Sequence, residues 1–336
     1  IETINVTSAS TVTLDTTAFT GLTDLNILAS SGADLITAAA TTAVSVVDTA
    51  AGGVTVDGGS SQTVSAVGAV TLGGTTATTG AINVTETGVG QLTTAIAIDG
   101  GSTVDVNSVL QSTGTITIGG TTAATGAVTV NTGIVAATTG GLITVDGGTT
   151  VSVIQEKTNA VNTDVTGQSA VTVNGGALTT EVTVTQAEVV AGAAAVTGVT
   201  GVNEVTAVTA VAGIGANGKV LITDANYDTA IANTIATVTL DSFAASSIIK
   251  ANALTTLNLS GTGGTLAITN ATSGSGATPT DNTTLGLNLN KYSGTNTITN
   301  TNNEITTLNV TTDGAASTLA AFTDTGLTTL NVAGDQ

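Results

Sequence analysis

The feature that most constrains the fold is a six-residue motif, apolar-x-Thr/Asp-apolar-Asn-apolar, that occurs five times in the chain. The copies occupy residues 1–6, 22–27, 254–259, 305–310 and 327–332. The first two copies start 21 residues apart and the last two start 22 residues apart. A strand that returns at a fixed distance near 20 residues is typical of a solenoid, in which each winding buries its apolar face against the next.

A second group of repeats fills the middle of the chain. Four copies of a short strand are each followed by Asp-Gly-Gly or Asn-Gly-Gly. The second glycine of these turns is residue 59, 101, 148 or 176. Between these copies, residues 72–80 and 118–126 carry a Gly-Gly-Thr-Thr-Ala loop and lie 46 residues apart. Glycine supplies the positive φ angles of such turns. The spacing of the loops predicts a larger repeat made of two coils.

These turns are compatible either with antiparallel hairpins or with the bends of a coil. The strands alternate apolar and Thr residues, so one face is consistently small and aliphatic, and near-identical strands return at a fixed distance. We therefore predict an all-β fold, a parallel β-solenoid (β-helix or β-roll), with roughly 20–23 residues per coil and loop insertions. At ~4.8 Å between strands, about 16 coils give a rod of about 75 Å.

Stacked coils place equivalent residues above one another. The repeat predicts that Asn5 lies beside Asn26 and that Asn309 lies beside Asn331. Amides in register form hydrogen-bonded ladders along a stack of strands. The alternative is that Asn is only tolerated at these positions.

The composition predicts a thin interior. Hydrophobic residues make up 41% of the 336 residues but aromatic residues only 1%. With a single proline, Pro279, the chain lacks the signature of disorder, and no apolar run approaches the ~20 residues of a membrane helix. We expect one continuous solenoid over 1–336, with insertions near 156–162, 271–282 and 290–303. Because its first residues already read as mid-strand sequence, we expect the chain to be a segment of a larger protein.

Charge limits the possible partners. The chain carries 23 Asp and Glu residues, four Lys and no Arg, for a net charge of −19. Nucleic acids and anionic lipids bind clustered basic residues, so we expect neither as a partner. Divalent cations relieve the repulsion among carboxylates, and Ca²⁺ prefers oxygen ligands. Calcium is therefore the cofactor that we expect.

Seven aspartates are the candidate calcium ligands. Three precede Gly-Gly turns at equivalent places in the repeat, and four lie at loop ends. They are Asp57, Asp99, Asp146, Asp224, Asp228, Asp313 and Asp324. The competing interpretation of each is that Asp is a good turn former.

Catalysis is not expected. The chain has no His and no Cys, the residues on which most nucleophilic and general-base chemistry depends at neutral pH. A pair of carboxylates in a polysaccharide-processing β-helix enzyme is the catalytic alternative. Thr-x-Thr strands also suggest an ice-binding solenoid, but the Thr pairs are interrupted from repeat to repeat.

The chain resembles the β-roll region of bacterial surface-layer proteins of the calcium-dependent, type I-secreted RTX kind. The resemblance is carried by residues 1–8, 219–224, 235–243 and 254–262. It implies a secreted protein that coats the cell surface, is ordered by Ca²⁺, and is anchored to cell-surface polysaccharide by a separate N-terminal domain. The family's calcium nonapeptide, Gly-Gly-x-Gly-x-Asp-x-apolar-x, is not present, which counts against dense calcium loading of this segment.

These observations lead to one expected function and one close alternative. We expect a structural, extracellular protein that assembles with copies of itself into a surface lattice (S-layer). The alternative is that the solenoid forms the stalk of a large secreted adhesin or of a biofilm-matrix filament.

Overall fold

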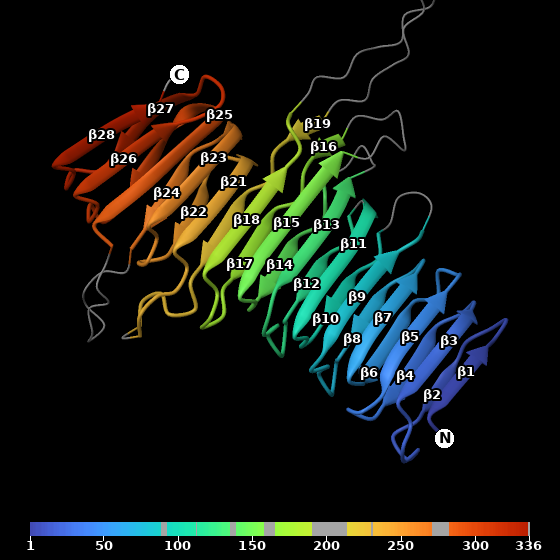
Figure 1. Cartoon of the computed structure of the whole chain (residues 1–336). Helices are drawn as coiled ribbons and strands as arrows, with labels where there is room; N and C mark the ends of the chain where they lie inside the picture. Colours follow the sequence, from blue (N-terminus) through green and yellow to red (C-terminus); the bar gives the residue numbers. More distant parts are fainter. Residues whose placement is uncertain are drawn as a thin grey trace, which may run out of the picture.

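The structure is a computed structural model that describes residues 1–88, 93–111, 113–134, 139–157, 165–189, 214–229, 231–270 and 282–334. Every secondary-structure element in these ranges is a β-strand, and every strand pairing in them is parallel. Successive strands follow one another from β1 to β28 along an elongated stack, and the two termini lie at opposite ends of it (Figure 1). The predicted parallel β-solenoid is therefore confirmed.

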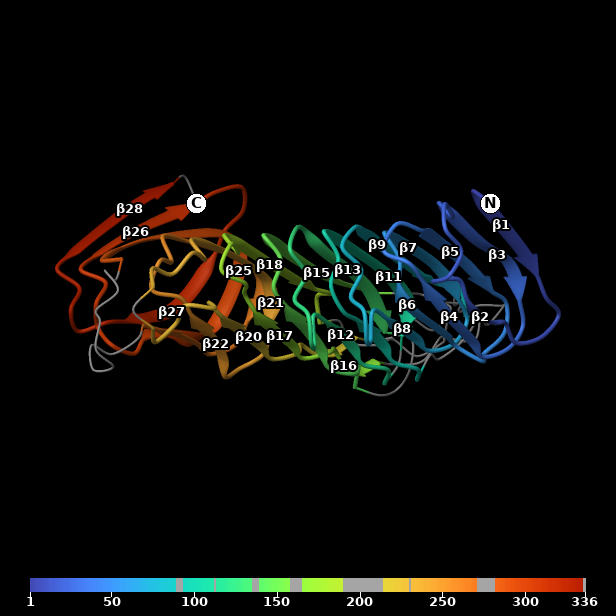
Figure 2. The same cartoon turned by 90° about the horizontal axis from the view of Figure 1, so that it is seen from below.

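Each coil contributes one strand to each of two facing layers, as the view from below makes clear (Figure 2). We call these layers sheet I and sheet II. Sheet I contains β1 (Thr3–Thr7), β3 (Asp24–Ser30), β5 (Ala43–Asp48), β7 (Ser61–Ala66), β9 (Ala81–Glu86), β11 (Thr103–Gln111), β13 (Val128–Ile134), β15 (Thr150–Lys157), β18 (Glu181–Gln186), β21 (Thr237–Phe243), β23 (Thr256–Gly263), β26 (Thr307–Thr312) and β28 (Thr329–Gly334).

Sheet II runs parallel to it on the other side of the core. It contains β2 (Thr13–Asp15), β4 (Asp34–Ala38), β6 (Val54–Gly58), β8 (Val70–Leu72), β10 (Ile96–Ile98), β12 (Ile116–Ile118), β14 (Ile143–Asp146), β17 (Val171–Asn174), β20 (Val220–Thr223), β22 (Ser247–Lys250), β24 (Leu266–Thr269) and β27 (Thr318–Thr323). The long β25 (Thr284–Asn300) pairs with both sheets and joins them into one 26-stranded sheet. A separate short pair, β16 (Val165–Gly167) and β19 (Ile214–Ala216), lies outside them.

Period-2 alternation produces the core. In sheet I, Val104 pairs with Val128 and Val128 with Val151, and all three side chains are 1% exposed. The residue that follows each of these valines is polar and points outward. Repeated in both sheets, this arrangement stacks Val, Ile and Leu in continuous columns, which is the thin aliphatic interior that the composition predicts.

The Asn ladder is also confirmed. Asn26 Nδ2 donates to Asn5 Oδ1 over 2.9 Å, and Asn331 Nδ2 donates to Asn309 Oδ1 over 2.8 Å. A third rung that the repeat did not predict joins Asn288 Nδ2 to Asn258 Oδ1 at 2.8 Å.

Coil length varies more than the sequence spacing suggests. The step between paired residues is 18 from Ala43 to Ser61 and 24 from Val104 to Val128. It is 31 from Val151 to Val182, 56 from Val182 to Val238, and 30 from Leu257 to Leu287. The longest step was not anticipated.

The three expected insertions have different outcomes. Most of 156–162 and nearly all of 271–282 lie outside the described residues. The expectation for 290–303 is wrong over most of its length, because β25 continues to Asn300. Tyr292 and Ile298, both at most 1% exposed, give this stretch the inward-pointing side chains of a strand despite its many Asn and Thr residues.

Candidate functional site

Two of the predicted aspartates connect one coil to the next. Asp57, next to last in β6, accepts backbone N–H bonds on Oδ1 from Thr75 at 2.9 Å and Thr76 at 2.6 Å. Asp99, just after β10, accepts equivalent bonds from Thr121 at 2.6 Å and Thr122 at 3.1 Å. Each carboxylate thus holds the Gly-Gly-Thr-Thr loop of the following coil, which explains why the larger repeat spans two coils.

Asp146 is the third aspartate of this group, but its partner differs. It accepts a 2.6 Å hydrogen bond on Oδ1 from Asn174 Nδ2, because the next coil carries Asn-Gly-Gly instead of a Thr-Thr loop. All three aspartates are half-buried. Stacking therefore brings each to an equivalent corner but does not bring the three together.

Asp224 and Asp228 lie in one loop after β20. Asp224 is 1% exposed, and its Oδ2 accepts N–H bonds from Thr234 and Ile235, both at 2.7 Å. Its Oδ1 accepts a bond of 2.8 Å from Asn226 N. Asp228 has a left-handed backbone with a φ of 60°. Asp224 therefore closes the loop through its hydrogen bonds.

Asp324 ties two further turns together near the C-terminal end. Its Oδ2 accepts from Asn300 Nδ2 at 2.7 Å and from Ile305 N at 3.2 Å, and its Oδ1 accepts from Gly326 N at 2.7 Å. Asp313 is exposed, as is Asp228, but Asp313 also lines a surface pocket.

That pocket belongs to a groove on the outer side of sheet I, where three successive coils bulge at the same place. The register of β21, β23 and β25 shifts there, and Ser242, Gly261 and Lys291 adopt left-handed φ angles of 61°, 63° and 53°. The residues just before the bulges, Asp241, Ser260 and Asn290, pair in register. Their side chains form a row of oxygen atoms across the strands.

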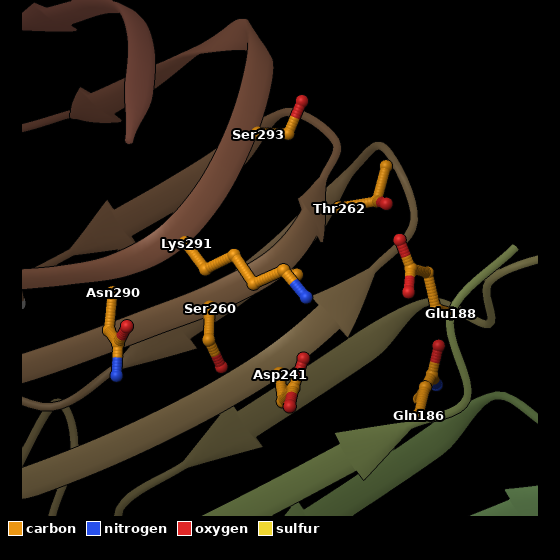
Figure 3. Close-up of a pocket in the computed structure, with 9 residues that line it drawn as sticks. Gln186, Glu188, Asp241, Ser260, Thr262, Asn290, Lys291 and Ser293 are labelled. Atoms are coloured by element: carbon orange, nitrogen blue, oxygen red, sulfur yellow. The ribbon is translucent and has the colours of Figure 1, made fainter. Parts of the chain in front are cut away.

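Two neighbouring pockets share Ser260 and Asn290 and make up the groove, with volumes of about 380 and 400 Å³. Gln186, Glu188, Thr262 and Ser293 border the first, and Lys291 extends across it (Figure 3). The second is lined by Asp313 together with the ladder residues Asn258 and Asn288 and with Thr239 and Thr311.

Asp241, Asn290 and Lys291 were missed by sequence reasoning. The available signal was a dipeptide that recurs at the same place in nearby coils. Its first residue is polar and its second is prone to left-handed φ, as in Ser260-Gly261 and Asp313-Gly314. The signal is weak because Ser242 and Lys291 occupy the same conformation without being Gly or Asn.

The oxygen atoms of this groove are of the kind that calcium prefers. Within the described ranges, no three Asp or Glu side chains gather as a metal cluster would require. A calcium ion at Asp313 would have one carboxylate there and would draw its remaining ligands from the amides and hydroxyls of Asn288, Asn290 and Thr311. At five of the other aspartates, hydrogen bonds already engage at least one carboxylate oxygen: Asp57, Asp99, Asp146, Asp224 and Asp324.

No helix long and apolar enough to cross a membrane occurs in the part of the chain that the structure describes. Comparison with known families and with curated proteins found no family model and no curated protein that this chain matches.

Proposed function

We propose that the chain is the solenoid part of a secreted bacterial protein that assembles with copies of itself into a lattice on the cell surface. The observation that carries the proposal is the outer face of sheet I. Its central column contains only short side chains from β1 to β25: Asn5, Asn26, Ser45, Thr63, Asn83, Asp105, Thr129, Ser152, Thr183, Thr239, Asn258 and Asn288.

Such a face suits repeated contact between copies. Short hydroxyl and amide side chains lose little conformational entropy when they are ordered at an interface, whereas Lys, Glu and Arg lose more. The column carries one charge, at Asp105, so repulsion between two such columns is small. A rigid stack also repeats its surface groups at the ~4.8 Å spacing of its strands, as a regular lattice contact requires.

Calcium is the proposed stabilising ion. The chain has 23 carboxylates and four lysines, so copies of it repel one another at neutral pH. An ion bound at the Asp313 pocket reduces this negative charge on the same outer face as the polar column. We therefore expect both stability and assembly to increase with Ca²⁺.

The stalk of an adhesin or filament is the second proposed function. It is favoured by the position of the two termini at opposite ends of the stack (Figure 1), because a rod of this kind holds flanking domains apart. A stalk needs no lateral contact between copies.

Electron microscopy of the purified chain with and without Ca²⁺ distinguishes the two functions. We expect ordered sheets with Ca²⁺ and their loss after chelation. Asp313→Asn should raise the calcium concentration needed for assembly, whereas Glu2→Gln, which removes one exposed carboxylate near the opposite end, should not. Single particles at every calcium concentration would contradict the lattice and favour the stalk.

A further inference from the structure

Two carboxylates are buried together where the first coils turn. Asp34 begins β4 and is 3% exposed, and Asp48 ends β5 and is 1% exposed. Ser30, the last residue of β3, pairs in register with Asp48 and donates a hydrogen bond from Oγ to Asp34 Oδ2. The three side chains therefore belong to one inward-facing corner.

One carboxylate oxygen of this corner has no hydrogen-bond partner. Asp34 Oδ1 accepts from Val12 N at 2.9 Å, and its Oδ2 accepts from Ser30. Asp48 Oδ1 accepts from Ala50 N at 3.1 Å, but Asp48 Oδ2 is buried without a hydrogen-bond partner. A buried anionic oxygen in this state carries a large desolvation cost.

No basic side chain belongs to the coils that carry these carboxylates. Residues 1–156 contain no Lys, Arg or His, and the other titratable groups of β2 to β7 are Asp15, Asp24 and Asp57, all acidic. Burial is the main cause that raises the pKa of Asp48, and repulsion from Asp34 adds to it. Nearby backbone amides, that of Ala50 first, act in the opposite direction without cancelling the rise.

The corner has little space for an ion with its ligands. A Cβ atom added to Gly32 would lie 2.6 Å from Thr11 N, and one added to Gly52 would lie 2.4 Å from Ala33 N. Successive turns are thus in backbone contact. Calcium takes six to eight oxygen ligands, whereas a proton requires no added volume.

We propose that Asp48, buried beside the carboxylate of Asp34, holds a proton in this corner in preference to a metal ion. A carboxyl group that is buried next to a like charge keeps its proton to higher pH. Because the folded state holds this proton more tightly than the unfolded chain, the stabilisation is complete in acid. It is lost as the pH rises from the ordinary pKa of Asp, ~3.9, through the raised value.

The test is an NMR titration of Asp carboxyl carbons in the whole chain, without metal, for three proteins. In the wild type we expect one carboxyl to titrate above the ordinary range of Asp. Asp48→Asn, which mimics the protonated group and keeps the oxygen that accepts from Ala50, should lose that titration. It should also lose the matching pH dependence of the unfolding midpoint. The control, Asp105→Asn, removes an exposed carboxylate of equal charge and should retain both.

Three results would overturn the proposal. The first is that every Asp carboxyl of the wild type titrates in the ordinary range. The second is that the high titration persists in Asp48→Asn. The third is that it emerges only after treatment with a chelator and disappears when Ca²⁺ is restored, because the pair would then hold a metal ion. If Asp48→Asn does not fold, the wild-type titration with and without Ca²⁺ still decides the matter.

Discussion

At the residue scale, the coils are joined by single side-chain oxygens that reach a neighbouring coil. Asp241 Oδ1 lies 2.4 Å from where a Cβ of Gly261 would be, and Asn290 Oδ1 lies 2.9 Å from the equivalent point on Gly314. Both glycines have left-handed φ angles, 63° and 77°. At these two places, the side chain before one turn therefore requires a glycine in the turn of the next coil.

Gly261→Ala tests this requirement. The new methyl group meets Asp241 and Ser242 and is strained by the left-handed backbone, so we expect a loss of about 1–3 kcal/mol in the free energy of unfolding. Gly21→Ala is the matched control, since Gly21 also has a left-handed φ, 79°, but nothing lies within 4 Å of its Cβ position. Urea unfolding measures both. Equal effects in the two variants would contradict the contact between coils.

Asp99 separates the structural from the calcium-binding interpretation of the turn aspartates. Asp99→Ala leaves the amides of Thr121 and Thr122 without their acceptor, and we expect it to cost about 1 kcal/mol, as in the loss of a helix cap. Asp99→Asn keeps an acceptor oxygen and should match the wild type without calcium. If Asp99→Asn is less stable than the wild type in the presence of Ca²⁺ but equally stable in its absence, Asp99 is a calcium ligand.

At the element scale, β25 replaces a corner by a continuous strand, and two aromatic rings fill the space beneath it. Phe243 and Tyr292 stack with their centroids 6.3 Å apart. Tyr292 fits because Gly263 and Gly294 lack side chains where its ring lies. The Tyr292 hydroxyl is buried and has no hydrogen-bond partner, and burial raises its pKa to about 12.

Tyr292→Phe should therefore stabilise the protein. Removing an unpaired buried hydroxyl is expected to gain about 1 kcal/mol at neutral pH. The gap should widen above the ordinary tyrosine pKa of ~10, because the unfolded chain ionises there while the folded protein keeps its proton until about pH 12. Denaturation at several alkaline pH values measures the difference. A less stable variant would mean that the hydroxyl has a partner.

The sequence predicts elements better than it predicts sites. Alternation and repeat spacing were sufficient for the strands and for the pairing of Asn5 with Asn26, because like residues meet when coils stack. They failed at residues 290–300, where Lys291 turns left-handed within a strand and hides the alternation. They also failed to predict the groove, because the placement of Asp241 and Asn290 on either side of Ser260 follows only once the intervening coil lengths are known.

At the scale of the whole molecule, insertions shorten the rod. In the part of the chain that the structure describes, sheet I contains 14 strands including β25, so its 13 steps of ~4.8 Å give about 62 Å instead of the expected 75 Å. The missing coils are accounted for by three long steps, the longest of which takes 56 residues between Val182 and Val238. Sequence spacing alone could not reveal this, since residues 190–213 carry neither the six-residue Asn motif nor a Gly-Gly turn.

Net charge sets how the whole rod responds to salt. With a charge of −19, the folded chain repels itself, and raising NaCl from ~0.01 M to ~1 M shortens the Debye length from ~30 Å to ~3 Å. We expect the thermal midpoint to rise with salt, and choline chloride to act as NaCl does. A falling midpoint would show that attraction, and not repulsion, dominates among the charges.

Stacking of the coils is tested most directly by distances between spin labels, which the absence of cysteine makes straightforward. Ser45 and Thr183 are six coils apart in the outer column of sheet I, and so are Thr63 and Thr239. Double electron–electron resonance on these two Cys pairs should give the same backbone separation, about 29 Å, although the second pair spans the longest step of the chain. Two clearly different distances would contradict the stacked solenoid.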